Sequence, residues 1–248
     1  DSSGLYQYDW NIPFGFNTNG KLIMWLGDID GMDDKTKGIL KPFNIPSDHL
    51  LIDSEFYQAQ MKCVFSEPII EKRILINKEA FISNIRKKYS VDLSHLTDEC
   101  QEHEKKVKRP VVFTETAVAE VINAYDKILI EGFNVSEMRK LYEVLYDSSE
   151  RNAKYTSWQS IKLIEAILAK LSLSVNNLDI TSVMSPLYIL HDYRILLDHL
   201  LSADKISDTK QHIVATLGVQ SFNDQESIYN EEIKRLNTLF NYLGVLSK

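Results

Sequence analysis

Arg194 and His199 are the residues whose types and spacing best suit a chemical reaction. They lie in the stretch 187–201, which is apolar on most faces and predicts a central helix. An arginine keeps its positive charge at every physiological pH, whereas a histidine exchanges a proton near neutrality. The pair therefore combines a fixed cation with a group that can act as an acid or a base.

The spacing Arg194-x4-His199, in a helix late in a predicted bundle, resembles the Arg-x4-6-His signature of the HEPN superfamily. The resemblance covers roughly residues 114–201. It implies a helical domain like those of nucleotide-binding proteins, ribonucleases and prokaryotic defence or toxin systems. Catalytic members are metal-independent ribonucleases whose arginine and histidine from two subunits meet in a dimer cleft. On this chain the resemblance implies that Arg194 stabilises phosphate charge and that His199 moves the proton at the 2′-hydroxyl or the leaving oxygen.

The same residues also allow a structural interpretation. Asp198 stands four positions after Arg194, which is the spacing of an ion pair within one helix. Catalytic members usually carry a polar residue directly after the arginine, where this chain has Ile195. In this interpretation Arg194 pairs with Asp198, and His199 satisfies a hydrogen bond or lies at the margin of the bundle.

Acidic residues and a histidine gather near the N-terminus. His49 and Asp53 stand four apart on a presumed helix and so share a face. A neighbouring loop carboxylate could complete a site for a hard metal. An acidic turn followed by a helix capped by Ser47 explains the same residues, and we expect neither a metal nor a cofactor. The loop carboxylates are Asp28, Asp30, Asp33 and Asp34.

Basic residues gather in the segment 71–113, which holds ten basic and seven acidic residues. Local positive charge on an acidic protein suits contact with a phosphate backbone, so RNA is an open alternative as a partner. Acidic residues interrupt the run, and helix ends attract lysine and arginine in any case, so a solvated face explains the same pattern. The candidate nucleic-acid contacts are Arg86, Lys87, Lys88, Lys106, Lys108 and Arg109.

Common catalytic motifs are missing from the sequence. It holds no GxxxxGK[ST] phosphate loop, no GxGxxG, no GxSxG and no HExxH. Nucleotide hydrolysis, dinucleotide redox chemistry and the common serine and zinc hydrolyses are therefore disfavoured. Cys63 and Cys100 lie in different segments without metal-spaced partners, which excludes zinc-finger and thioredoxin-type arrangements.

The elements that must position these residues divide the chain. Six of nine glycines and four of six prolines fall within the first 68 residues, whereas later segments show helical periodicity. We predict an α+β fold: a β-containing head at 1–70, a helix and charged basic connector at 71–110, and a helical bundle at 111–248. In the head, the runs 10–16 and 21–26 predict a hairpin around 17–20, and 60–65 predicts a third strand.

Capping residues place the starts of the helices. Thr114 predicts a helix to about 130, Ser136 one to about 146, and Ser157 one to about 171. Ser185 followed by Pro186 predicts the start of the helix that carries Arg194. Further helices are predicted at 78–89, 203–219 and 224–243, and a solvated helix or linker at 99–109.

The sequence favours a binding function over catalysis. No apolar run approaches the roughly 18 residues of a membrane span, and the first residues lack a signal-peptide pattern, so we expect a cytoplasmic protein without a membrane partner. We predict a non-catalytic binding or scaffold module, an accessory domain of a larger defence or regulatory protein, that contacts a protein partner or a second copy of itself. The alternative is a HEPN-like, metal-independent ribonuclease acting as a homodimer.

Overall fold

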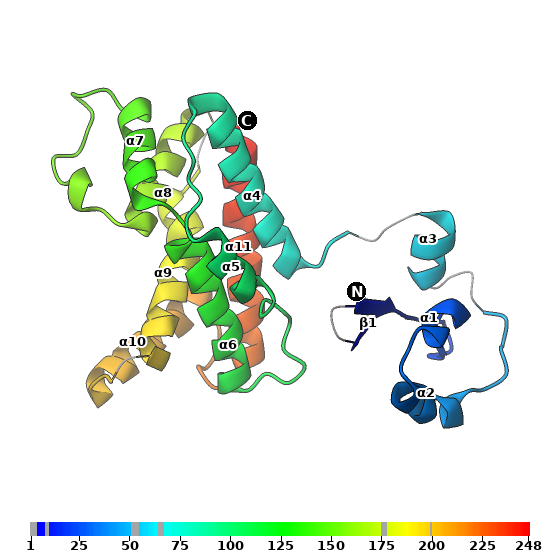
Figure 1. The fold of residues 1–248 in the computed structure, drawn as a ribbon. Coiled ribbons are helices and arrows are strands. Elements are labelled where there is room, and N and C mark those ends of the chain that lie inside the picture. The colour runs from blue at the N-terminus through cyan, green and yellow to red at the C-terminus, as the bar shows by residue number, and fades with distance from the viewer. Residues whose placement is uncertain (1–3, 8–9, 51–54, 64–66, 175–177, 199) are drawn as a thin grey trace. The chain divides into compact units, whose positions relative to one another are not determined.

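The computed structural model describes residues 4–7, 10–50, 55–63, 67–174, 178–198 and 200–248 (Figure 1). The chain divides into two compact units, Asp1–Ile69 and Ile70–Lys248, which are described separately here as the N-terminal unit and the helical unit. The first contains short antiparallel strands and the second is helical, so the predicted α+β class is confirmed.

The N-terminal unit contains two small antiparallel pairings. Strand β1 (Gly4–Gln7) pairs with β2 (Trp10–Pro13), and β3 (Gly15–Phe16) pairs with β4 (Leu22–Ile23). The predicted hairpin turn at 17–20 is confirmed, because Gly20 has a φ of 72° and its N–H donates to the Asn17 carbonyl over 2.9 Å. Glycine adopts this left-handed conformation without steric cost.

Helices make up the rest of the N-terminal unit. They are α1 (Leu26–Asp30), α2 (Asp34–Leu40), the 3₁₀ turn η1 (Lys41–Phe43) and α3 (Glu55–Lys62). The third strand predicted at 60–65 is wrong for residues 60–63, because 60–62 end α3 and Cys63 lies in no strand, whereas residues 64–66 lie outside the described part. Tertiary packing favours the helix here, because the buried Phe56 of α3 packs against Gly15.

Ser47 does not cap a helix, which corrects a second prediction in this unit. Its Oγ accepts the N–H of His49 over 3.1 Å, and the carboxylate of Asp48 accepts the N–H of Leu50 over 3.2 Å. Such local turns compete with a helix for the backbone donors. Asp48 also accepts from the Asn17 side chain over 2.9 Å, which ties this segment to the hairpin turn.

The helical unit is built around two long helices distant in sequence. Helix α4 (Ile70–Tyr89) packs along α11 (Gln225–Leu246), and α9 (Ile180–Asp198) packs against α11 and α6 (Glu115–Asp126) (Figure 1). A π-helical turn, η2 (Lys127–Glu131), continues α6. The remaining elements are α5 (Thr97–Glu104), α7 (Val135–Leu145), η3 (Tyr155–Ser157), α8 (Ser160–Leu171), η4 (Ser172–Ser174) and α10 (Ala203–Leu217).

Several predicted helices are confirmed. Thr114 caps α6 by accepting the N–H of Ala117, and Asp224 caps α11 by accepting the N–H of Ser227. The helix predicted at 78–89 is the second half of α4, and that at 203–219 corresponds to α10. No helix within the described ranges is long and apolar enough to cross a membrane.

Three predicted helix starts are wrong. Helix α7 is capped by Asn134, whose side chain accepts the N–H groups of Ser136 and Glu137. Ser157 ends the turn η3, and α8 begins only at Ser160. Serine and asparagine cap with similar strength, so the sequence alone does not choose between neighbouring candidates.

The third wrong start concerns α9, which begins at Ile180 and therefore contains Pro186 in its interior. A proline has no N–H for the carbonyl four positions earlier, which here belongs to Ser182. The Ser185 hydroxyl donates to that carbonyl over 2.8 Å. The side-chain hydrogen bond of Ser185 thus replaces the missing backbone bond, and the helix continues past the proline.

Candidate functional site

Arg194 lies on α9 and binds two carboxylates of the neighbouring chain segment. Its Nη1 donates to Asp126 Oδ2 over 2.9 Å and to Glu131 Oε1 over 2.8 Å. Asp126 ends α6 and Glu131 ends η2, so the π-helical turn brings both carboxylates to one guanidinium. Glu131 also accepts from Lys127 over 2.7 Å, which neutralises its charge further.

Asp126 is the most enclosed of these groups, with no exposed side-chain surface. Burial raises the pKa of its carboxyl above the ordinary value, and the positive charge and hydrogen bond of Arg194 act in the opposite direction. Arg194 therefore offsets part of the cost of burying the Asp126 carboxylate.

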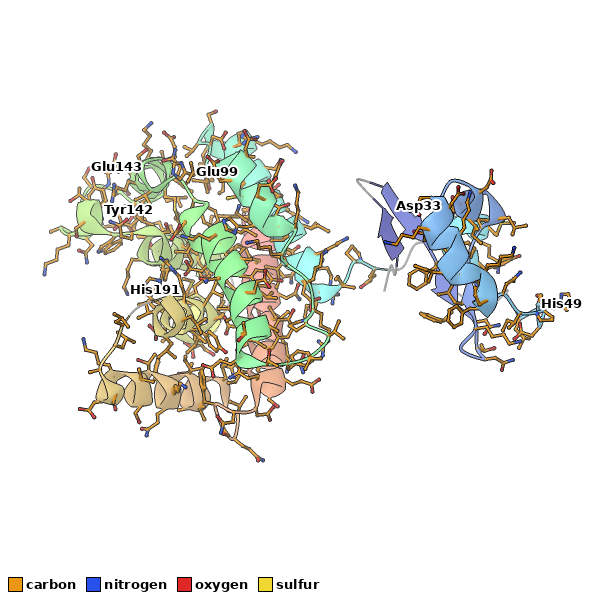
Figure 2. All side chains as sticks on the ribbon, turned by 60° about the horizontal axis from the view of Figure 1, so that its bottom comes forward. Asp33, His49, Glu99, Tyr142, Glu143 and His191 are labelled. Carbon is orange, nitrogen blue, oxygen red and sulfur yellow. The ribbon has the colours of Figure 1, made fainter. Side chains whose placement is uncertain are left out.

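His191 faces the same buried aspartate from one helical turn before Arg194. Its Nδ1 lies 3.6 Å from Asp126 Oδ1, and neither atom makes a hydrogen bond within the described part of the chain. The side chain is nevertheless 43% exposed. Figure 2 labels His191 on α9. His191 thus has one buried nitrogen beside a carboxylate and a surface open to solvent.

A cavity of about 620 Å³ lies where these groups meet the starts of α7 and α8. We call it the α7–α8 cavity. It is large enough for a small organic ligand, since such sites usually span roughly 300–1,000 Å³. Its wall is formed by His95, Ile130, Glu131, Phe133, Asn134, Val135, Ser136, Gln159, Ser160, Ile161, Lys162, His191 and Arg194.

His199 lies outside the described residues, as does the side chain of Asp198. The proposed Arg194–His199 reaction pair and the alternative Arg194–Asp198 ion pair therefore both stay predictions. The structure does show that Arg194 reaches across to α6 and η2, where it binds carboxylates.

The six basic residues proposed to contact nucleic acid lie on the surface of the helical unit, at the end of α4 and after α5. Lys88 donates to the Lys248 carbonyl over 3.5 Å, and Arg86 and Arg109 also bind other residues of the chain. Arg86 donates to Asp92 over 2.7 Å, and Arg109 donates to Asn230 over 2.9 Å while its guanidinium lies over the Phe113 ring. Lys87, Lys88, Lys106 and Lys108 are exposed.

The acidic segment of the N-terminal unit forms helix ends. Asp33 caps α2 by accepting the N–H of Thr36 over 2.8 Å, and Asp28 lies in the first turn of α1. Asp53 lies outside the described residues. Within the described ranges, no three His, Cys, Asp or Glu side chains gather as metal ligands.

The sequence pattern did not single out Asp126, His191 or Ser160, although all three lie at or beside the cavity. One signal was present for His191, because it precedes Arg194 by three positions and so lies on the same helical face. Asp126 and Ser160 carry no comparable signal, since their places depend on how α6, α8 and α9 pack.

Comparisons with family models, with curated proteins and with solved structures found no match to this chain.

Proposed function

We propose that this chain is a non-catalytic binding module, and that its N-terminal unit binds a second copy of the chain. The observation that carries the proposal is that more large apolar side chains are exposed than buried in that unit. Among residues 14–50, 56–59, 61–63 and 67–69 of that unit, whose side-chain burial the structure describes, only Met32 and Phe56 are buried large apolar side chains. Nine others are exposed: Phe16, Leu22, Trp25, Leu26, Ile39, Phe43, Ile45, Leu50 and Met61.

Exposed apolar side chains at this density indicate a contact surface. The same unit is acidic, with ten acidic and five basic residues among positions 1–70. Its binding partner should therefore present apolar side chains in a basic setting, because complementary charge favours encounter and specificity.

The segment 71–113 of a second copy has this chemistry. It carries ten basic and seven acidic residues, and four of its apolar side chains are exposed: Ile76, Leu96, Val111 and Val112. A contact between unlike surfaces of two copies is heterologous and gives closed rings or longer assemblies according to its geometry.

Sedimentation velocity of the full chain over a range of protein concentrations tests the proposal. We expect concentration-dependent association that weakens in high salt, because salt screens the contribution of charge. Leu26→Ser should weaken association, whereas Leu173→Ser should leave it unchanged. The two leucines are matched, being 81% and 74% exposed, but Leu173 lies in η4 of the helical unit. A monomer at every concentration, or equal effects of the two substitutions, would contradict self-association.

The HEPN-like ribonuclease, acting through Arg194 and His199 as a homodimer, is a second candidate, because Arg194 lines a cavity of the helical unit. Two ion pairs already occupy Arg194, which supports the binding module over the nuclease. RNA cleavage in the presence of a chelator tests the second candidate. A nuclease should lose cleavage in His199→Ala with little change in melting temperature, because a catalytic histidine contributes more to rate than to packing. Absence of cleavage by the parent chain would remove this candidate.

A further inference from the structure

The first turn of α8 opens on the α7–α8 cavity without a cap. Its N-cap residue, Gln159, makes no side-chain hydrogen bond to the turn, and the first helical bond runs from the Leu163 N–H to the Gln159 carbonyl. The N–H groups of Ser160, Ile161 and Lys162 are therefore free of helical partners, and all three residues line the cavity. Such a set of donors, at the positive end of a helix dipole, favours an anion.

Ser160 adds a second, independent indication of a ligand. The residue is 5% exposed and lines the cavity, yet its hydroxyl makes no hydrogen bond within the described ranges. The hydroxyl is not among the described polar atoms that are closed off from solvent without a partner, so it opens on the cavity. A ligand oxygen in the cavity would give it a hydrogen-bond partner.

The first turn of α7 also borders the cavity, but its N–H groups already have hydrogen-bond partners in the chain. Asn134 Oδ1 accepts the N–H groups of Ser136 and Glu137 and also the Ser136 hydroxyl. These donors are already used by the chain. The open donors of the cavity therefore concentrate at the start of α8.

Charged side chains around the open donors suit the same ligand. Lys162 is 55% exposed, and its Nζ donates to Glu165 over 2.7 Å. Its partner Glu165 is 26% exposed, and the Lys162 Nζ also lies 5.8 Å from the centre of the Tyr188 ring. A partly exposed pair of this kind is worth about 1 kcal/mol, which is the cost for Lys162 to turn to a ligand. The carboxylate on the wall, Glu131, pairs with Lys127 over 2.7 Å and shares Arg194 with Asp126.

We propose that the α7–α8 cavity binds a small phosphate monoester, with its phosphate at the first turn of α8. The phosphate oxygens accept from the free N–H groups, the Ser160 hydroxyl and Lys162. A phosphate fits this number of donors better than a carboxylate, because it offers more oxygens. The organic part of the ligand lies against Ile130, Phe133 and Ile161, the apolar part of the wall.

Isothermal titration calorimetry of the full chain with phenyl phosphate tests this proposal. We expect one site with a dissociation constant of about 1 mM or tighter. Phenol, which has the ring without the phosphate, should give no binding. Ser160→Ala and Lys162→Met should each weaken binding about tenfold, through loss of a hydrogen bond to a charged group.

Lys140→Met is the matched control for Lys162→Met. Lys140 is 64% exposed and pairs with Glu137 three positions earlier on α7, but it does not line the cavity. Melting curves of the three variants show whether each still folds. The proposal is overturned if phenyl phosphate gives no heat of binding, if phenol binds as tightly, or if Lys162→Met and Lys140→Met bind equally. None of these outcomes depends on self-association or on RNA cleavage.

Discussion

Arg194 is held by two carboxylates, and one of them, Asp126, is fully buried. Arg194→Met would leave that carboxylate without its cation. We expect the free energy of unfolding to fall by about 3 kcal/mol, the usual cost of breaking a buried pair by removing one partner. Urea unfolding at neutral pH measures the loss.

The control for this prediction is Arg86→Met. Arg86 pairs with Asp92 over 2.7 Å, but both side chains are more than half exposed. Its removal should cost no more than about 1 kcal/mol. Asp126→Asn combined with Arg194→Met should cost less than the sum of the two single changes, because the amide leaves no buried charge. Equal losses of unfolding free energy for Arg194→Met and Arg86→Met would mean that the buried Asp126 pair contributes no more to stability than an exposed pair.

Glu232 on α11 supplies a prediction about pH. The residue is 1% exposed, and neither carboxyl oxygen makes a hydrogen bond within the described ranges. Burial raises the pKa of this carboxyl well above its ordinary value of 4.5, and Arg235 opposes the rise only in part. Because the folded pKa is raised, the stability due to this group is fully present below the unfolded pKa. It is lost as the pH rises from there through the folded pKa.

Glu232→Gln removes this dependence, since an amide does not ionise. We expect the variant to gain stability relative to the parent as the pH rises from 5 to 8, by up to about 1.4 kcal/mol per pH unit until the folded pKa is passed. Urea unfolding at several pH values measures the gap. Glu231→Gln changes the neighbouring and more exposed position, and it should show the same pH dependence of unfolding free energy as the parent chain. A constant gap between Glu232→Gln and the parent would contradict a buried, protonated carboxyl.

At the scale of elements, α9 shows how a side-chain hydrogen bond can replace a backbone bond that a proline removes. Pro186 cannot donate to the Ser182 carbonyl, and the Ser185 hydroxyl does so over 2.8 Å. In the parent chain, Ser185→Ala should lower the free energy of unfolding by about 1 kcal/mol, the usual contribution of one hydrogen bond. In a Pro186→Ala chain the backbone N–H restores the helical bond, so the same Ser185→Ala change should cost almost nothing.

Chemical denaturation of the four chains completes this double-mutant cycle. Pro186→Ala alone should raise stability, because a proline inside a helix is unfavourable by about 3 kcal/mol relative to alanine. If Ser185→Ala costs the same in both backgrounds, the hydroxyl is not the substitute donor.

The helices could be predicted from sequence to different degrees. Thr114 was recognisable as a cap because it comes before a periodic apolar run. The start of α9 was missed because a serine and a proline form a strong local start signal, which the packing of α9 against α6 and α11 overrides. Local signals locate helices, but tertiary packing fixes their ends.

The candidate site was less predictable than the helices. Arg194 was recognised by its residue type and its place on an apolar helix. Its partners Asp126 and Glu131 lie more than 60 positions earlier in the chain, at |i−j| of 68 and 63. Long-range pairs of this kind leave no spacing pattern. The open first turn of α8 was also missed, because Ser157 was predicted as the cap whereas it ends η3 and Gln159 precedes α8.

At the scale of the whole molecule, the two units differ in how much they bury. The helical unit has a continuous core that includes Tyr125, Tyr193 and Tyr229, all fully buried. In residues 14–50, 56–59, 61–63 and 67–69 of the N-terminal unit, only Met32 and Phe56 are buried large apolar side chains. So little buried apolar surface over these ranges indicates a marginally stable unit. The two units should therefore unfold at different temperatures.

The three tryptophans can separate the two transitions, because Trp10 and Trp25 belong to the N-terminal unit and Trp158 to the helical unit. In a Trp158→Phe chain, tryptophan emission should change at a lower temperature than the ellipticity at 222 nm, which follows mainly the helical unit. In a Trp10→Phe/Trp25→Phe chain, emission and ellipticity should change together. The measurement belongs at a protein concentration where the chain is monomeric, because self-association through the N-terminal unit would stabilise it by mass action. Raising the concentration should then move only the first transition upward, and coincident transitions in both chains would instead mean that the two units unfold as one.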